Sequence, residues 1–375
     1  MGSEHRDQAN AKRVRYAVIG QGYFSQAAIL PAFNRAPCSE LKAIFSDDPL
    51  KLAELTKRYG VEHGKTYEEY DRFLESGEVD AVYIALPNNM HCEYTVRAAR
   101  AGVHVLCEKP MATSEDECAK MIQACASTNV KLMIAYRLHF EEANLRAIQL
   151  VKEGRLGDVR SFNSVFTMQV RDGNMRLSSD LGGGPLNDIG IYCINAARYI
   201  FQDEPVEVSA FSASRDDDKR FEEVEEQFGV VMRFPQARLA TFIAGFGASD
   251  QARYDVVGTR GTLRVDPAYE MATELRHELC VDGKTERTTF EKRDQVASEL
   301  IYFSGCIRED RTPEPSGSEG LADVRIIHAI SESARTGRAI SVERVVRRAR
   351  PDLSQEIHVP PHSMPKLVHA RPPSS

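Results

Sequence analysis

A lysine, an aspartate and a tyrosine in this sequence are candidates for acid–base chemistry. Lys109 stands in the run Glu108-Lys109-Pro110, directly after the alternating apolar stretch Val103–Cys107. This alternation is typical of a buried strand, and Pro110 has no N–H group that could continue it. Lys109 is therefore expected at the carboxyl end of a strand, where open α/β sheets place ligands. A solvated Lys–Glu pair at a strand edge is the alternative, and the tripeptide alone leaves it open.

The other two candidates, Asp188 and Tyr192, are four residues apart within a predicted helix, Leu186–Phe201. Residues at this spacing lie on one face of a helix, one turn from each other. The run Gly182-Gly183-Gly184-Pro185 precedes the helix, and its glycines would allow a close approach to another group. A capping aspartate with a half-buried tyrosine remains the alternative interpretation.

A glycine-containing turn near the N-terminus predicts a dinucleotide site. An apolar strand pattern, Val14–Gly20, runs into Gly20-Gln21-Gly22-Tyr23-Phe24-Ser25, and a helical pattern follows. This is the dinucleotide fingerprint with Ser25 at the position of the third glycine. Such glycines let the backbone approach a pyrophosphate, and the helix N-terminus supplies N–H donors. A plain strand–helix turn is the alternative, but a second strand, Leu41–Ser46, follows at a βαβ distance.

The end of that second strand bears on the choice between NAD and NADP. A carboxylate there binds the ribose 2′-hydroxyl, whereas its absence together with a nearby cation accommodates the 2′-phosphate. The strand ends at Ser46, and Lys51 follows five residues later. This pattern favours NADP(H), although Asp47 and Asp48 are close enough to leave NAD open.

The elements that must position these residues predict an α/β fold with two domains. Strands and helices alternate over residues 14–137, as in a doubly wound parallel Rossmann sheet. Residues 138–342 contain long strand-like segments, which predict an α+β domain with a large, mostly antiparallel open sheet covered by helices on one face. We expect a flexible N-terminus over residues 1–13. Residues 343–375 are Pro-rich and are expected to be a tail or arm that cannot build a core.

The composition limits the classes of function. At 375 residues the chain is long enough for two domains, since single cores stop growing near roughly 250–300 residues. The formal net charge of −7 argues against binding to nucleic acid or to an anionic membrane. One basic cluster near the C-terminus, interpreted as a solvated face, comprises Arg344, Arg347, Arg348 and Arg350.

Targeting and metal signals are weak. No apolar run approaches the roughly 18 residues that span a membrane, and the polar start of the chain predicts a cytoplasmic protein. The eight cysteines include no C-x-x-C pair. They are therefore expected to be buried free thiols, and no metal site is expected.

Taken together, these motifs resemble the Gfo/Idh/MocA oxidoreductases, and specifically the branch of glucose–fructose and aldose–aldose oxidoreductases. The matching segments occur in order, as Gly20-Gln21-Gly22, Pro87-Asn88-Asn89-Met90-His91, Glu108-Lys109-Pro110 and Asp188-Ile189-Gly190-Ile191-Tyr192. The wider family usually carries histidine where this sequence has Tyr192, whereas that branch carries tyrosine in a stretch similar to residues 191–199. Further similarity lies in residues 135–140, 220–225 and 319–338, so the resemblance covers roughly residues 14–342. The lack of an export signal and the Pro-rich tail depart from that branch. They count against its periplasmic location and its N-terminal oligomer-forming arm.

The resemblance implies hydride transfer to and from sugars. It implies that Tyr192 acts as general base on the sugar hydroxyl, with the nicotinamide flanked by Pro87 and Glu108. A free phenol keeps its proton up to about pH 10, so a neighbouring Lys109 ammonium is expected to stabilise the phenolate. Asp188 is expected to orient the sugar hydroxyls and to balance the charge of Lys109.

Two sets of binding residues follow from the resemblance. The expected cofactor set, for NADP(H), is Gly20, Gly22, Tyr23, Phe24, Ser46, Lys51, Pro87, Asn88, His91, Glu108, Lys109 and Arg137. The expected substrate set is Tyr136, Arg137, Arg176, Asp188 and Tyr192.

The implied reaction oxidises an aldose to its lactone and reduces a second sugar to an alditol in a ping-pong cycle on a retained cofactor. One alternative is an ordinary NAD(P)-dependent sugar or polyol dehydrogenase that releases its cofactor. Another is a nucleotide-binding sensor without chemistry, against which the intact Lys109 and Asp188/Tyr192 motifs count. We expect small-molecule sugars as partners, no nucleic acid, no membrane, and a homo-oligomer, a dimer through the open face of the C-terminal sheet.

Overall fold

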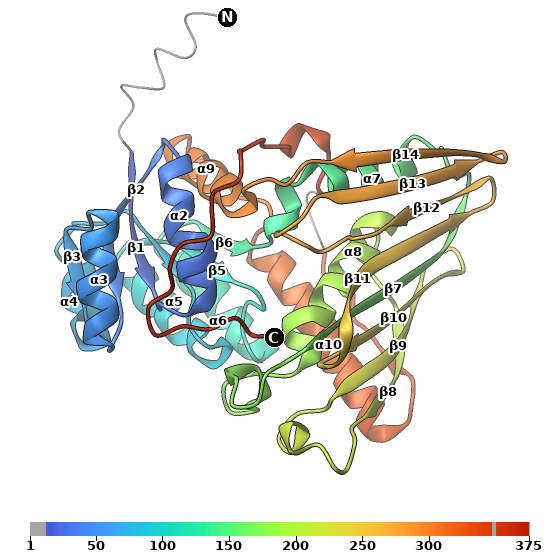
Figure 1. The fold of residues 1–375 in the computed structure, drawn as a ribbon, viewed down its shortest axis with the longest axis horizontal. Helices are drawn as coiled ribbons and strands as arrows, with labels where there is room; N and C mark the ends of the chain where they lie inside the picture. Colours follow the sequence, from blue (N-terminus) through green and yellow to red (C-terminus); the bar gives the residue numbers. More distant parts are fainter. Residues whose placement is uncertain (1–12, 347–349, 375) are drawn as a thin grey trace, which may run out of the picture.

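Two open sheets with helices packed on them organise the protein (Figure 1). The structure is a computed structural model that describes residues 13–346 and 350–374. The predicted flexible N-terminus falls almost wholly on residues 1–12, which lie outside the described residues.

The N-terminal sheet is parallel, with strand order β3-β2-β1-β4-β5-β6. Its strands are β1 Val14–Ile19, β2 Ser39–Phe45, β3 His63–Lys65, β4 Ala81–Ile84, β5 His104–Glu108 and β6 Leu132–Ala135. Its own helices are α2 Leu30–Ala32, α3 Pro49–Tyr59, α4 Tyr70–Leu74, α5 His91–Arg100 and α6 Glu115–Ser127. The central strands are apolar almost throughout because helices cover both faces of a parallel sheet. The predicted Rossmann sheet is therefore confirmed.

The C-terminal sheet has the order β14-β13-β12-β11-β7-β10-β9-β8-β15 and is antiparallel except between β7 and β10. Its strands are β7 Val159–Gln169, β8 Glu207–Ala213, β9 Gln227–Phe234, β10 Arg238–Gly245, β11 Gly247–Gly258, β12 Gly261–Val265, β13 Leu275–Val281, β14 Lys284–Phe290 and β15 Ile340–Ser341. Three helices pack on one face, α7 Glu142–Lys152, α8 Ile191–Phe201 and α10 Gly317–Thr336. In β9 every second residue is buried, as expected for a sheet that helices cover on one face only. The predicted mostly antiparallel sheet is confirmed.

Strands β13 and β14 and helix α9, Gln295–Arg308, have no counterpart in the sequence-based prediction. Strand β14 carries polar residues that are exposed in all but the last position, so it lacks an apolar alternation. Strand β13 pairs with β14 along its whole length. Helix α9 packs against β1 and β2 of the N-terminal sheet. The N-terminal half therefore includes a helix that lies far from residues 14–137 in the sequence.

The C-terminal segment, residues 350–374, also departs from expectation. We expected a tail or arm outside any core, but Val359 and Val368 are buried in the cluster around the N-terminal sheet. In Figure 1 the segment runs down over α2 and ends between the two sheets. The prediction was wrong because two widely spaced valines give no periodic signal, yet each fills a site that the folded domain already provides.

Two global properties follow from the described residues. Among them, no helix is long and apolar enough to cross a membrane, and no group of three His, Cys, Asp or Glu side chains could hold a metal ion. All eight cysteines are free thiols.

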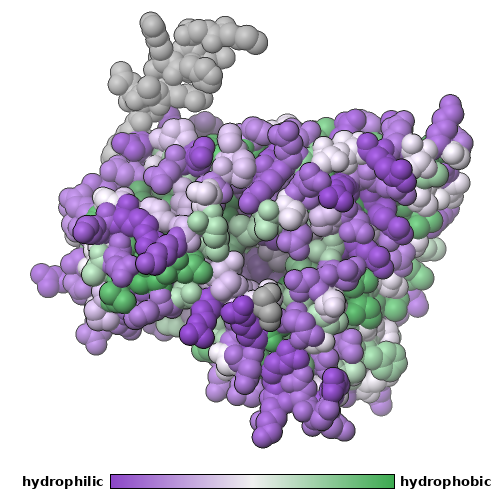
Figure 2. Space-filling model, in the orientation of Figure 1, coloured by the Kyte–Doolittle hydropathy of each residue, from purple (hydrophilic) through white to green (hydrophobic). Residues whose placement is uncertain are grey.

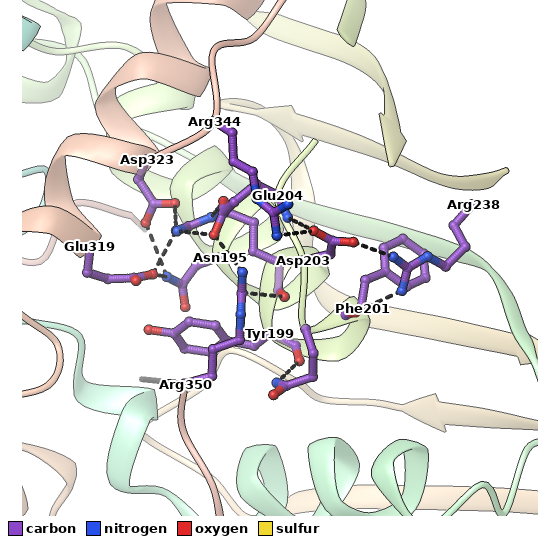
Figure 3. A network of polar contacts seen from close by, with 12 residues as sticks. Asn195, Tyr199, Phe201, Asp203, Glu204, Arg238, Glu319, Asp323, Arg344 and Arg350 are labelled. Atoms are coloured by element: carbon purple, nitrogen blue, oxygen red, sulfur yellow. Dashed lines mark hydrogen bonds and ion pairs between the residues drawn. The ribbon is translucent and has the colours of Figure 1, made fainter. Parts of the chain in front are cut away.

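A buried network of charges fixes helix α8 (Figure 3). The guanidinium of Arg198 is fully buried and contacts Glu204 at 2.5 Å, Glu319 at 2.7 Å and also Asp323. Burial raises the pKa of Asp323 to about 6, although the Arg198 charge opposes this shift. Because charges removed from water must be paired, this network holds α8, α10 and the loop after α8 in one arrangement.

The basic cluster near the C-terminus contributes to the same network. Arg350 donates to Glu204 at 2.9 Å, and Arg344 pairs with Asp203 at 3.0 Å. The interpretation of this cluster as a solvated face is therefore wrong for Arg350, whose partner is buried. Arg347 and Arg348 lie outside the described residues.

Replacement of Arg198 tests this network. Arg198→Met leaves the Glu204, Glu319 and Asp323 carboxylates facing one another without their shared cation. The free energy of unfolding, measured by denaturant titration, should fall by about 3–5 kcal/mol.

Arg215→Met is a matched control, since the pair that Arg215 forms with Asp217 is solvent-exposed. It should leave the midpoint of unfolding unchanged. Equal midpoints for the two variants would show that the buried network does not stabilise the fold.

Candidate active site

A cleft lies between the two sheets, at the carboxyl ends of β1, β2, β4, β5 and β6. Its volume is about 670 Å³, which lies within the roughly 300–1,000 Å³ of small-molecule pockets. A hollow between the two halves is visible on the face in Figure 2. Most of the predicted site residues line this cleft, namely Gly20, Gly22, Tyr23, Phe24, Ser46, Lys51, Pro87, Asn88, Glu108, Lys109, Arg137, Arg176, Asp188 and Tyr192.

The Gly20–Gly22 turn fits a dinucleotide. Gly20 has a φ of +97°, and a Cβ there would lie 2.5 Å from the carbonyl oxygen of Ala85. A Cβ on Gly22 would meet no protein atom within 4 Å. One glycine therefore allows β1 and the end of β4 to approach, and the other leaves the backbone open toward the cleft. The helical residues that begin at Ser25 follow directly, as in a pyrophosphate cradle.

The two carboxylates near the end of β2 do not line the cleft, and both accept hydrogen bonds from backbone N–H groups. Asp47 accepts from the backbone N–H of Tyr67 at 3.2 Å. Asp48 caps α3 by accepting from the N–H groups of Leu50 and Lys51, and it also contacts His369 at 2.9 Å. Ser46 and Lys51 line the cleft at this point. The group that would meet a ribose here is therefore a hydroxyl or an ammonium.

Lys109 and Asp188 connect the two halves. The Lys109 Nζ donates to the backbone carbonyl of Asp188 at 2.8 Å and lies 3.5 Å from its carboxylate. Arg176 donates to the other carboxylate oxygen at 2.6 Å. Burial alone would raise the pKa of Asp188, but the charges of Arg176 and Lys109 outweigh burial and lower it. Asp188 is therefore an ionised acceptor held between two cations.

The Tyr192 phenol lies between two cations as well. The Lys109 Nζ is 4.8 Å from the centre of its ring, and the Nε of Arg137 donates to its hydroxyl at 3.0 Å. Gln295 and the carbonyl of Tyr269 hold the rest of the guanidinium. The sequence led us to expect Lys109 beside the phenol oxygen. The structure places Lys109 over the ring face and Arg137 at the oxygen.

Local structure explains these positions. Lys109 is the residue directly after β5, and Arg137 begins a short helical turn that follows β6. Asp188 lies in a wide π-helical turn, Leu186–Gly190, that leads into α8. Such turns are frequent at functional sites, and here the turn presents the carbonyl of Asp188 to Lys109 while Tyr192 follows on α8.

The glycine run before α8 forms a close contact between the two halves of the molecule. Asn88 donates its amide N–H to the carbonyl of Gly182 at 2.8 Å. A Cβ on Gly182 would lie 2.8 Å from Asn88 and from Thr113, and a Cβ on Gly183 would lie 2.4 Å from the carbonyl of Arg176. These glycines therefore allow the loop before α8 to contact the turn after β4.

Two predicted site residues lie behind the cleft. His91 is fully buried, and its ring nitrogens contact the carbonyls of Pro110 and Leu86 at 2.9 and 3.0 Å. The His91 side chain therefore links the segment that follows Lys109 to the end of β4. Tyr136 is buried with its hydroxyl toward Asp323, and burial raises the pKa of Tyr136 well above its ordinary value. It lines a smaller, mostly apolar cavity behind Tyr192. Neither side chain borders the cleft as the sequence led us to expect.

Glu108 borders the cleft, and through the Tyr83 hydroxyl it is connected to Glu299, a residue that the sequence analysis did not identify. Glu108 accepts from the Tyr83 hydroxyl at 2.7 Å, and the same hydroxyl lies 3.4 Å from Glu299 of α9. Burial raises the pKa of Glu108, with the Lys109 charge opposing the shift. Glu299 and Gln295 both come from α9. Asp294, which caps that helix before an apolar run, is the sequence signal that could have revealed it.

Comparisons with known proteins agree with this geometry. A family model described as the oxidoreductase family with an NAD-binding Rossmann fold, GFO_IDH_MocA, matches residues 14–136. The GFO/IDH/MocA C-terminal domain model matches residues 144–264.

Individual relatives are similar over most of their length. The NADP(+) D-xylose 1-dehydrogenase of Haloarcula marismortui is 32% identical over 338 residues, which cover 88% of this chain and 93% of that protein. The structure of aldose-aldose oxidoreductase from Caulobacter crescentus complexed with glycerol has a TM-score of 0.85 and 37% identity, with 88% of this chain and all of that chain covered. KijD10, a 3-ketoreductase from Actinomadura kijaniata in complex with NADP and TDP-benzene, has a TM-score of 0.79 and 26% identity, covering 86% and 98%.

Proposed function

This chain belongs to the Gfo/Idh/MocA family of oxidoreductases, and from that premise we propose that it is an NADP(H)-dependent oxidoreductase of sugars. It oxidises an aldose to its lactone and reduces a second sugar to an alditol on the same retained cofactor. The observation that carries this proposal is the Tyr192 hydroxyl, bound by Arg137 in the cleft that also contains the dinucleotide turn. The names of the relatives, a D-xylose dehydrogenase and an aldose–aldose oxidoreductase, support sugars as substrates.

Tyr192 is the proton acceptor in this proposal. When bound, the nicotinamide accepts a hydride from the sugar carbon and can return it to a second carbonyl. The charges of Arg137 and Lys109 stabilise Tyr192 as a phenolate. Its oxygen takes the proton of the reacting hydroxyl and thereby becomes a phenol. In the second half-reaction the phenol returns the proton to the oxygen of the reduced sugar, which restores the starting state.

Asp188 orients the sugar. Its ionised carboxylate can only accept hydrogen bonds, and it lies one helical turn before Tyr192. Arg176 and Lys109 already contact its two oxygens, and these have further lone pairs for sugar hydroxyls. Asp188 also offsets the positive charge that Lys109, Arg137 and Arg176 bring into the cleft.

NADP(H) is favoured over NAD(H) by the residues at the end of β2. Ser46 and Lys51 line the cleft, whereas Asp47 and Asp48 do not and accept hydrogen bonds from backbone N–H groups. A 2′-phosphate would meet an ammonium there and no carboxylate.

A simple dehydrogenase that releases its cofactor in each cycle is the second candidate, and the D-xylose dehydrogenase relative favours it. A sensor without chemistry is disfavoured because Lys109, Asp188 and Tyr192 form a connected set.

We also propose a dimer through the uncovered face of the C-terminal sheet. Four large apolar side chains are exposed there on β8, β9 and β10, namely Phe211 (77%), Val231 (43%), Leu239 (46%) and Ile243 (40%). Phe211 and Ile243 both lie opposite Gly229, so they adjoin one another across three strands. A contiguous apolar patch of this kind is typical of an interface between protein chains.

The reaction is tested with a pair of aldoses and no added cofactor. The purified protein should form lactone and alditol in equal amounts. Tyr192→Phe keeps the ring over which Lys109 lies but removes the proton acceptor, so turnover should fall about 10²- to 10⁴-fold while the affinity for NADP(H) stays unchanged. A near-normal rate in this variant would remove Tyr192 from the mechanism. Turnover only with added NADP would favour the simple dehydrogenase.

The choice of cofactor is tested at Lys51. Lys51→Ala should weaken NADP(H) binding about tenfold, equivalent to roughly 1.4 kcal/mol, and leave NAD(H) binding unchanged, as measured by fluorescence titration. Lys57→Ala, on the exposed end of the same helix, is the control. If Lys51→Ala binds NADP(H) as tightly as the wild type does, Lys51 does not contact the phosphate.

The dimer is tested by placing a charge in the apolar patch. Phe211→Glu should convert the protein to a monomer, with the molar mass measured by light scattering, because an unpaired carboxylate cannot be buried at low cost. Met364→Glu changes an equally apolar exposed residue elsewhere and should leave the mass unchanged. A wild-type protein that is already monomeric would contradict the proposal.

A further inference from the structure

The C-terminal segment crosses from one half of the molecule to the other and back. It starts at Arg350, which is bound to Glu204 in the buried network of the C-terminal half. It then lies on the N-terminal half, where Val359 and Val368 are buried. Its last residues return to the C-terminal half, so the chain closes a path over the cleft (Figure 1).

Specific polar contacts hold the middle of this segment on the nucleotide-binding side. The fully buried side chain of Gln26, which follows the Gly20–Gly22 turn, forms two hydrogen bonds with the backbone of Val368, at 2.7 and 2.8 Å. His362 contacts Asp294 at 2.8 Å and the carbonyl of Ala27 at 2.9 Å. A buried amide paired in this way fixes the segment beside the dinucleotide turn.

Beyond Val368 the segment passes the end of β2 and enters the cleft. His369 contacts Asp48, the residue that caps α3. The next residues line the same cleft as the dinucleotide turn, in the order Arg371, Pro372, Pro373 and Ser374. We name residues 371–374 the strap.

The strap is attached on the far side of the cleft by its last two residues. The carbonyl of Pro373 accepts from the N–H of Arg171 at 2.9 Å. Ser374 forms an antiparallel bridge with Val170, the buried residue that follows β7. The C-terminal segment is thus tied to both halves of the molecule, by the buried contacts of Val368 on one side and by the few bonds of the strap on the other.

We propose that the strap forms a wall of the nucleotide site and must detach from Val170 and Arg171 before NADP(H) can enter or leave. This inference rests on the proposed function and gives the retained cofactor a physical cause. Segments held by few hydrogen bonds open more easily than the core does. The bonds between Gln26 and Val368 stay closed in this opening, so the strap swings from the buried end of the segment.

Arg371 gives the strap an affinity for the cofactor. Among the described residues it forms no ion pair with a carboxylate, and it lines the cleft that contains the Gly20–Gly22 turn and Lys51. A guanidinium in that position is suited to a phosphate oxygen of the dinucleotide. If this is the 2′-phosphate, Arg371→Ala weakens NADP(H) binding alone. If it is the pyrophosphate, the variant weakens NADP(H) and NAD(H) equally.

The experiment uses a chain that ends at Ala370, which lacks the strap but keeps the contacts of Val368 with Gln26 and of His369 with Asp48. Release of bound NADPH is followed by fluorescence after mixing with an excess of NADP. We expect release to be at least tenfold faster from the shortened chain than from the wild type. Lys366→Ala, in the same segment but outside the cleft, should release NADPH at the wild-type rate.

A second measurement needs no variant. Amide hydrogen exchange of the full chain should slow when NADPH is bound, because the closed strap keeps its contacts with Arg171 and Val170. The amides that report this are those of Arg371 and Ser374, the two strap residues with an N–H, and that of Arg171, which donates to the carbonyl of Pro373. Bound NADPH with equal release rates, or with unchanged exchange in the strap, would overturn this inference and leave the proposed function standing. Failure of the wild type to bind NADP(H) at all would overturn both.

Discussion

The hydrogen bond from Arg137 to the Tyr192 hydroxyl joins the two halves of the molecule, and the candidate active site depends on it. Arg137 follows the last strand of the parallel sheet, and Tyr192 lies on a helix of the other half. A phenol can release its proton near neutral pH only where positive charge is close. The proposed chemistry therefore requires the two halves to stay at this spacing, and the hydrogen bond from Lys109 to Asp188 is a second contact between them.

Rigid support behind the cleft keeps this spacing. Helix α8 carries Tyr192 at its start and the buried Arg198 further along. The ion pairs of Arg198 with Glu204 and Glu319 therefore hold the helix in place on the sheet. On the opposite side, Gln295 and Tyr269 hold the Arg137 guanidinium in one orientation. An arginine held at three points is pre-organised and would lose little freedom in the proton transfer proposed for Tyr192.

The C-terminal segment ties these two supports together. It begins in the network around Arg198, is buried beside the dinucleotide turn at Val368, and ends at the carboxyl end of β7. A chain that crosses the cleft in this way couples the approach of the two halves to the state of the nucleotide site. The strap and the interdomain contacts of Lys109 and Arg137 therefore favour the same closed arrangement.

The sequence by itself determined the local features of this protein. The period-2 and helical apolar patterns predicted the two sheets, and the motifs at Gly20, Lys109 and Tyr192 predicted which residues meet at the cleft. Such features are readable because they depend on neighbours within a few residues. The tertiary structure alone decided that Arg137 is the partner of the phenol oxygen, that His91 and Tyr136 lie behind the cleft, and that residues 350–374 belong to the fold. These facts depend on contacts between residues far apart in the chain, such as Val368 with Gln26. No local pattern encodes such contacts, because each partner has its role only once the other is in place.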